Sequence, residues 1–157
     1  MSRPGEAFHL HALVEAMVRT DRDEAEIAAA VREAVVAAPR ILVAEDETLV
    51  RLDLRAMLAG AGYDVCAEAA DGLEAVKLAA EHEPDAILMD ANMPRLDGVT
   101  AARRILATRE VPIVMLTGYE YGELIDRAYE AGVVRYLVKP VGEREVIDAL
   151  SAVVRAA

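Results

Sequence analysis

Residues 41–47 read Ile-Leu-Val-Ala-Glu-Asp-Glu, an apolar run that changes abruptly to carboxylates. The same change occurs at residues 86–90, where Ala-Ile-Leu-Met is followed by Asp90. A short, continuous apolar run of this kind is typical of a strand that is buried on both faces of a parallel sheet. Both stretches therefore predict central strands that end in acidic residues.

Strand-like and helix-like segments alternate from Arg40 to the end of the chain. Predicted strands lie at residues 41–44, 63–66, 86–89, 111–116 and 133–138. Apolar residues at helical spacing predict helices over residues 49–58, 72–81, 98–107, 121–131 and 142–155. Strand–helix units with short connections imply right-handed crossovers. We therefore expect an α/β fold, a flavodoxin-like five-stranded parallel sheet in the order 2-1-3-4-5 with helices on both faces.

The first part of the chain follows a different pattern, in which the polar residues 20–24 separate two amphipathic segments and offer N-cap oxygens to the second. The apolar stripes are Leu10, Leu13, Val14 and Met17 in the first segment, and Ile27, Val31, Ala34 and Val35 in the second. This predicts an N-terminal helical hairpin over residues 1–39 and an α/β domain over residues 40–157. So small a hairpin cannot bury both stripes within itself, and we expect it to dock on the α/β domain, on a second copy or on a partner.

Composition excludes several classes of protein. The chain has 157 residues, about one domain, and its 17 basic and 28 acidic side chains give a net charge of −11, which disfavours direct binding to nucleic acid. The single cysteine, Cys66, excludes an internal disulfide and a multi-cysteine zinc site. No apolar run is long enough to span a bilayer, and residues 1–6 lack the apolar part of a signal peptide. We therefore expect a cytoplasmic protein that does not enter the membrane.

Four of the predicted strands are followed by polar residues. These residues are Glu45 and Asp46 after strand 1, Asp90 after strand 3, Thr117 after strand 4, and Lys139 with Pro140 after strand 5. The carboxyl ends of parallel strands lie at one edge of the sheet, and strands 1, 3, 4 and 5 are neighbours in the expected order. We therefore expect these side chains to meet in one shallow pocket.

Such a pocket favours a particular chemistry. Its clustered carboxylates must either retain a proton or bind a hard divalent cation, and oxygen ligands suit Mg²⁺. A cation held there permits attack by an aspartate carboxylate on phosphorus, which gives an acyl phosphate. Asp90 lies centrally among the strand ends and is the best candidate for the nucleophile, whereas Thr117 supplies a hydroxyl and Lys139 a cation to the phosphoryl oxygens.

The same stretches resemble the receiver domain of bacterial two-component response regulators. The resemblance covers about residues 40–155, through ILVAEDE (41–47), ILMDANMPRLDG (87–98), VMLTG (114–118) and YLVKP (136–140). It implies that Asp90 accepts a phosphoryl group from a sensor histidine kinase or a phosphotransfer protein, with Mg²⁺ (or Mn²⁺) as cofactor. It further implies that Asp46 binds the metal directly, that Glu45 acts through water, and that the backbone carbonyl of Asn92 is a further ligand beside Asp90.

The resemblance also implies a conformational switch. Thr117 and Tyr136 are the expected switch pair, and the peptide bond between Lys139 and Pro140 is expected to be cis. Phosphorylation then changes the surface formed by the fourth helix, the fifth strand and the fifth helix of residues 40–157. We expect output through a homodimer, a protein effector or the N-terminal hairpin, and no turnover of a substrate, so that the chain is not an enzyme.

Several alternatives stay open at this stage. ILVAEDETLVRLDL (41–54) resembles receivers of antiterminator-type (ANTAR) regulators, which favours a receiver that controls RNA-binding antitermination, although we expect no RNA-binding domain after the receiver because the chain stops at Ala157. A haloacid-dehalogenase-type phosphatase also uses an aspartate nucleophile, but it requires a second aspartate where Asn92 stands. A flavodoxin-like FMN carrier requires a phosphate-binding loop that the acidic residues 45–47 would repel. Asp46 alone could simply be the N-cap of the following helix.

Overall fold

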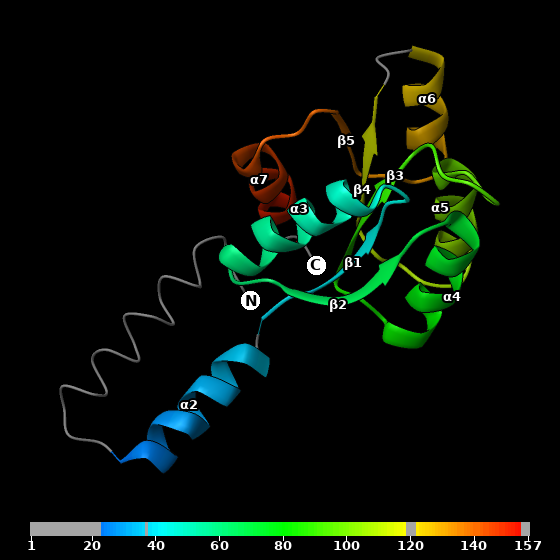
Figure 1. Cartoon of the computed structure of the whole chain (residues 1–157). Coiled ribbons are helices and arrows are strands. Elements are labelled where there is room, and N and C mark those ends of the chain that lie inside the picture. The colour runs from blue at the N-terminus through cyan, green and yellow to red at the C-terminus, as the bar shows by residue number, and fades with distance from the viewer. Residues whose placement is uncertain (1–22, 37, 119–121, 155–157) are drawn as a thin grey trace.

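A parallel sheet forms the centre of the computed structural model, which describes residues 23–36, 38–118 and 122–154 but not the side chains of residues 33–36 (Figure 1). The strands are β1 (Arg40–Ala44), β2 (Asp64–Ala69), β3 (Ala86–Asp90), β4 (Ile113–Thr117) and β5 (Arg135–Val138). The helices are α2 (Glu24–Val36), α3 (Thr48–Gly60), α4 (Gly72–His82), α5 (Gly98–Leu106), α6 (Gly122–Glu130) and α7 (Glu143–Val154). The strand order is β2-β1-β3-β4-β5, and every pairing is parallel. The predicted fold class and strand order are therefore confirmed.

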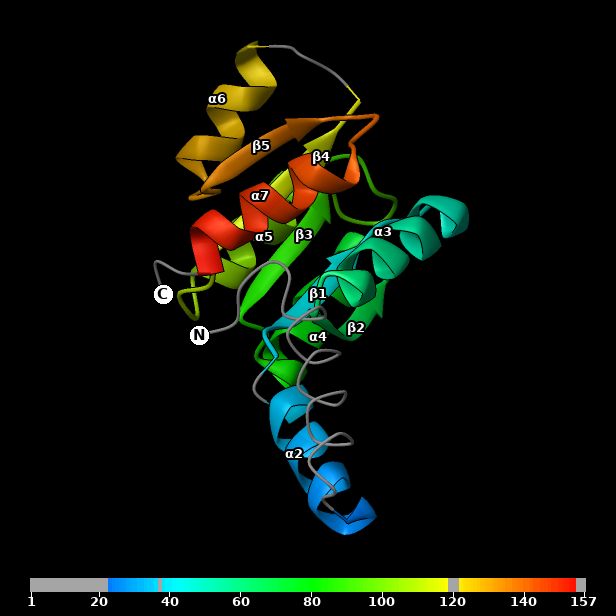
Figure 2. The same cartoon turned by 90° about the vertical axis from the view of Figure 1, so that its left-hand side faces the viewer.

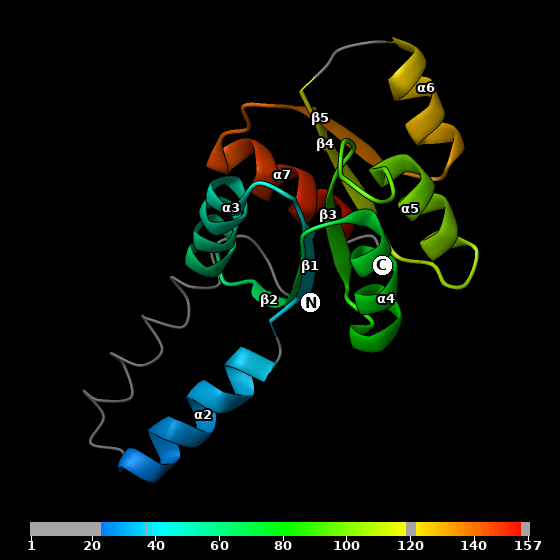
Figure 3. The ribbon, with the colours of Figure 1, turned by 45° about the vertical axis from the view of Figure 1, so that its right-hand side comes forward.

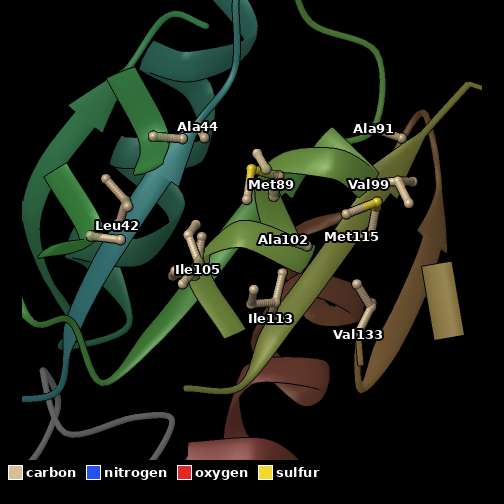
Figure 4. Close-up of a cluster of buried hydrophobic side chains, with 14 of the residues drawn as sticks. Leu42, Ala44, Met89, Ala91, Val99, Ala102, Ile105, Ile113, Met115 and Val133 are labelled. Atoms are coloured by element: carbon tan, nitrogen blue, oxygen red, sulfur yellow. The ribbon is translucent and has the colours of Figure 1, made fainter. Parts of the chain in front are cut away.

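Helices cover both faces of the sheet (Figure 3). On one face, α4, α5 and α6 pack against alternate residues of the central strands, such as Leu42, Met89 and Met115 (Figure 4). On the other face, α3 and α7 pack against the intervening residues, which include Val43 and Leu88. The strands β1, β3 and β4 read as continuous apolar runs because both of their faces are buried in this way.

The bounds of some strands differ from the sequence prediction. The strand β2 continues to Ala69 rather than ending at Cys66, because it stays paired with β1 up to the contact of Ala44 with Ala69. The strand β4 begins at Ile113 rather than Val111, after a proline that has no N–H to donate to a neighbouring strand. The strand β2 is an edge strand with one neighbour and mixed burial, so its apolar pattern marks its end poorly.

The helix α2 extends away from the sheet in all views (Figures 1 and 2). Its first turn is capped by Asp23, whose carboxylate accepts a hydrogen bond from the N–H of Glu26 at 2.8 Å. The predicted helix around residues 10–17 lies outside the described residues, so the hairpin and the division at residue 39 stay predictions. Within the described ranges, no helix combines the length and the apolar character that crossing a bilayer requires.

Two glycines allow the segments around Asp90 to pack closely. The N–H of Gly98 donates to the carbonyl of Ala91 at 2.9 Å, and a Cβ atom at position 98 would lie 2.1 Å from the carbonyl oxygen of Asp90. A Cβ atom at position 72 would lie 1.9 Å from the carbonyl oxygen of Leu96. The starts of α4 and α5 are therefore held against the loop that follows β3, and a side chain at either glycine would push that loop away.

Replacement of Gly98 by alanine is expected to destabilise the protein by roughly 1–3 kcal/mol, because the added methyl group overlaps backbone atoms that cannot move independently. Gly60→Ala is the matched control, since nothing lies within 4 Å of a Cβ atom there. Urea unfolding followed by circular dichroism measures both variants. Equal stability of Gly98→Ala and the wild-type protein would contradict the packing described here.

Candidate functional site

The ends of β1 and β3 bring three carboxylates together. Glu45, Asp46 and Asp90 each place an oxygen within 4.8 Å of the other two. Glu45 is fully buried and Asp90 is 4% exposed, whereas Asp46 is exposed. The cluster therefore has a buried side within the sheet edge and an open side through which a ligand can enter.

Backbone hydrogen bonds set the position of these acids. The N–H of Glu45 donates to the carbonyl of Ala69 on β2 at 2.9 Å, which extends the sheet by one residue beyond β1. The N–H of Ala91 donates to the carbonyl of Leu116 on β4 at 2.7 Å, and the N–H of Asn92 donates to the Asp90 carboxylate at 3.2 Å. Both acidic strand ends are thus fixed by the neighbouring strands.

Asp46 does not cap the helix that follows it. The N-cap of α3 is Glu47, whose side chain makes no capping hydrogen bond, and the N–H of Glu47 donates instead to the Glu45 carboxylate at 3.3 Å. The alternative in which Asp46 only caps a helix is therefore wrong. Its carboxylate lies in the acidic cluster instead.

Lys139 lies against the two buried acids. Its Nζ atom is 2.9 Å from Oε2 of Glu45 and 3.3 Å from Oδ2 of Asp90, and its backbone N–H donates to the carbonyl of Thr117 at 2.6 Å. The peptide bond between Lys139 and Pro140 is cis. A single ammonium group thus faces a cluster of three carboxylates.

The charge imbalance shifts the pKa values of Asp90 and Lys139. Burial, assisted by the negative charge of Glu45, raises the pKa of Asp90 to about 7, although the Asn92 N–H and the Lys139 ammonium oppose the change. Burial acts to lower the pKa of Lys139, but its hydrogen bond to Glu45 and the charge of Asp90 outweigh burial and raise it. The site therefore favours added positive charge at Asp90, either a proton or a cation. The ligand atoms are all oxygens, which fits a hard divalent ion such as Mg²⁺.

The remaining predicted residues lie on β4, on β5 and in the loop after β3. Thr117 is buried as the last residue of β4, and Asn92 is exposed two residues beyond Asp90. Tyr136 is partly buried opposite Met115 in the β4–β5 pairing. Thr117 lies two residues after Met115 on β4, and side chains two residues apart on a strand point to the same face. Thr117 and Tyr136 therefore lie on the same face of the sheet.

Two ion pairs beside the site were not predicted from the sequence. The guanidinium of Arg51 donates to the backbone carbonyl of Glu45 at 2.7 Å and lies 3.4 Å from the Glu68 carboxylate. Asp71 caps α4 and lies 3.2 Å from Arg95 in the loop after β3. Each pair joins residues from different elements. The Asp71-Gly72 sequence predicted the start of a helix, but no sequence pattern pairs Arg51 with Glu68 or Asp71 with Arg95.

The chain is similar to members of a known protein family. Residues 41–151 match the family described as the response regulator receiver domain. The chain is 48% identical over 115 residues to the transcriptional regulatory protein PdtaR of Mycobacterium tuberculosis, a match that covers 73% of this chain and 56% of PdtaR. It is 33% identical over 115 residues to the chemotaxis protein CheY of Bacillus subtilis, covering 73% of this chain and 96% of CheY.

A solved structure has the same fold and a metal in its cleft. It is the receiver domain of a sensor histidine kinase from Pseudomonas aeruginosa, with magnesium ion coordinated in the active site cleft. The TM-score is 0.69 at 36% identity, and the match covers 76% of this chain and 99% of that domain. This chain thus spans nearly all of these single domains but only about half of PdtaR.

Without divalent cations, Asp90→Asn is expected to stabilise the protein by about 1–3 kcal/mol near pH 8, and the gain is expected to shrink towards pH 5. The pKa of Asp90 rises from its ordinary value of 3.8 to about 7 on folding. The fold therefore favours the protonated acid, and this contribution to stability is lost as the pH rises through about 7. Urea unfolding at both pH values in the presence of a chelator measures the effect. A gain that is equal at both pH values, or larger near pH 5, contradicts the assignment.

Proposed function

This chain belongs to the response regulator receiver domain family, and from this premise we propose that Asp90 accepts a phosphoryl group from a phosphohistidine. Receiver domains bind Mg²⁺ at an acidic site and interact with histidine kinases or phosphotransfer proteins. The observation that carries the proposal is the position of Asp90, which lies with Glu45 and Asp46 in one cluster and within 3.3 Å of the Lys139 ammonium.

The proposed reaction is a phosphoryl transfer between two protein side chains. An oxygen of the ionised Asp90 carboxylate attacks phosphorus, the bond between phosphorus and the donor imidazole nitrogen breaks, and its electron pair stays on that nitrogen. Lys139 is already beside the attacking carboxylate and supplies positive charge to the phosphoryl oxygens. Thr117, buried at the end of the adjacent strand, supplies a hydroxyl to the same oxygens.

The divalent cation is proposed to lie among the acidic side chains. Asp46, Asp90 and the backbone carbonyl of Asn92 would hold it directly, and Glu45 would act through water. The 2.9 Å contact between Glu45 and Lys139 supports this division, because one oxygen of the Glu45 carboxylate already binds the lysine before a phosphoryl group arrives. Mg²⁺, or Mn²⁺ with the same ligands, supplies charge that offsets the carboxylates and the incoming phosphoryl oxygens.

Phosphorylation of Asp90 is proposed to change the conformation of a surface that Thr117 connects to the site. As Thr117 moves towards the phosphoryl group, Tyr136 can turn inwards along the same face of the sheet, which changes the surface formed by α6, β5 and α7. The described part of this region includes Tyr129 on α6 and Val134 in the loop that leads into β5, two large apolar side chains that are each 48% exposed. We propose that a second copy or a protein effector binds there.

A second apolar surface lies beside the acidic cluster. Leu49 and Leu52 on α3 are 81% and 50% exposed, and α3 follows directly after Glu47. We propose that the histidine-bearing donor docks on this surface, which would bring its phosphoryl group to Asp90. The predicted N-terminal helical hairpin over residues 1–39 is proposed as a separate element that also contacts a partner, and the protein is proposed to be cytoplasmic.

The chain is proposed to act as a phosphorylated switch and not as an enzyme that turns over a substrate. Asn92 stands where a phosphatase of the haloacid-dehalogenase type needs a second aspartate, and an amide cannot exchange the proton. The similarity to PdtaR, named as a transcriptional regulatory protein, supports an output in gene regulation. Control of RNA-binding antitermination is therefore the second candidate for the output, beside a homodimer or a protein effector.

Asp90→Asn is expected to abolish phosphorylation by the small donor phosphoramidate, because an amide oxygen cannot form the acyl phosphate. Intact-protein mass spectrometry with Mg²⁺ present should show the gain of one phosphoryl group in the wild-type chain. Asp53→Asn, which removes an exposed carboxylate from α3, should label like the wild type. Omission of the divalent cation should also prevent labelling. A gain of mass in Asp90→Asn would defeat the assignment.

Beryllofluoride with Mg²⁺, a mimic of the phosphoryl group, is expected to shift the full chain from monomer to dimer. Val134→Glu should prevent this shift by placing a charge on the proposed surface, whereas Leu73→Glu, at a 38% exposed leucine on α4, should not. Analytical ultracentrifugation with and without the mimic distinguishes these outcomes. If Val134→Glu dimerises as readily as the wild type, the copies do not meet at this surface.

A further inference from the structure

Arg51 links the acidic turn to the edge of the sheet. It lies one turn into α3, and its side chain is 19% exposed. Its Nη1 atom donates to the backbone carbonyl of Glu45 at 2.7 Å, while its Nε atom lies 3.4 Å from Oε1 of Glu68 on β2. The guanidinium therefore bridges a backbone atom of the site and a carboxylate of the neighbouring strand.

The carbonyl of Glu45 belongs to the peptide plane between Glu45 and Asp46. The N–H of Glu45 is held by Ala69 on β2, and its carbonyl is held through Arg51 by Glu68, the residue before Ala69. Both backbone groups of Glu45 are thus tied to one strand. Since the orientation of this plane sets the direction in which the Asp46 side chain leaves the backbone, Arg51 acts on Asp46 without touching it.

We infer that Arg51, held by Glu68, is a positioning residue for the divalent cation, because it fixes the peptide plane from which Asp46 reaches the cluster. The inference rests on the proposed function, in which Asp46 and Asp90 bind that cation. Residues that orient metal ligands commonly affect affinity strongly although they do not touch the metal. A forked guanidinium suits this role, since it can hold a carbonyl and a carboxylate at once.

The sign of the effect separates positioning from simple electrostatics. Loss of the Arg51 charge removes a cation near the site and leaves the Glu68 carboxylate with Arg55 as its remaining ion-pair partner among the described residues. Both changes favour the arrival of another cation, so electrostatics alone predicts tighter binding of Mg²⁺ when Arg51 is neutralised. Positioning predicts weaker binding, because the peptide plane and the Asp46 carboxylate are then free to turn.

The test is the affinity of the full chain for Mg²⁺, measured by isothermal titration calorimetry without a phosphodonor. Arg51→Gln is expected to weaken binding roughly tenfold. Arg51→Lys keeps the positive charge but replaces the planar, forked guanidinium with a compact ammonium group. This variant is also expected to weaken Mg²⁺ binding. Arg55→Gln is the matched control: Arg55 lies one turn further along α3, 3.4 Å from the same Glu68, and it should bind Mg²⁺ within about twofold of the wild type.

The outcomes separate this inference from the proposed function. Unchanged or tighter binding in Arg51→Gln overturns the inference while the proposed function stands. If Arg51→Gln does not fold, unchanged binding in Arg51→Lys overturns it in the same way. If the wild-type chain binds no Mg²⁺, or Asp46→Asn binds as tightly as the wild type, the proposed metal site itself fails. Equal weakening by Arg51→Gln and Arg55→Gln would assign the effect to the loss of a partner of Glu68, which both arginines contact, and not to the hold of Arg51 on the Glu45 carbonyl, and it would overturn the inference.

Discussion

The charge balance between three carboxylates and one lysine is the constraint on which the site depends. Two unit charges about 4 Å apart repel by roughly 4 kcal/mol at an effective dielectric constant near 20, and burial of Asp90 further raises the pKa of its carboxyl group. Lys139 compensates part of this cost by contacting both acids. The remainder favours a proton on Asp90, whose pKa is raised to about 7. In our proposal a divalent cation takes over this role, and Lys139 then moves from Glu45 to the phosphoryl group.

The fold makes this arrangement unavoidable. Strands β1 and β3 are neighbours with the same direction, so the residues that follow Ala44 and Met89 must meet at one edge. The backbone of each acidic end is then fixed by the next strand outwards, through Ala69 on β2 and Leu116 on β4. Close packing at Gly98 holds the loop after Asp90 against the same edge. The apolar core therefore serves the site by keeping mutually repulsive groups from separating.

Sequence reasoning located the central strands well because both of their faces are buried, which leaves continuous apolar runs with polar ends. It placed Glu45, Asp46 and Asp90 at one edge, and their proximity in the structure follows from the strand order alone. It could not find the pairing of Arg51 with Glu68, since these residues lie on a helix and an edge strand with no shared periodicity. The end of β2 was missed for a related reason, because pairing with β1 and not burial determines it.

A crystal structure of the chain with Mg²⁺ and beryllofluoride tests the central claim most directly. Our account predicts the beryllium on a carboxylate oxygen of Asp90, the metal between Asp46 and Asp90, and the Lys139 ammonium moved from Glu45 to a fluorine of the mimic. It also predicts that the carbonyl of Glu45 stays bound to Arg51. Beryllofluoride on another residue, or a Lys139 ammonium that remains on Glu45 while Asp90 carries the mimic, would contradict the account.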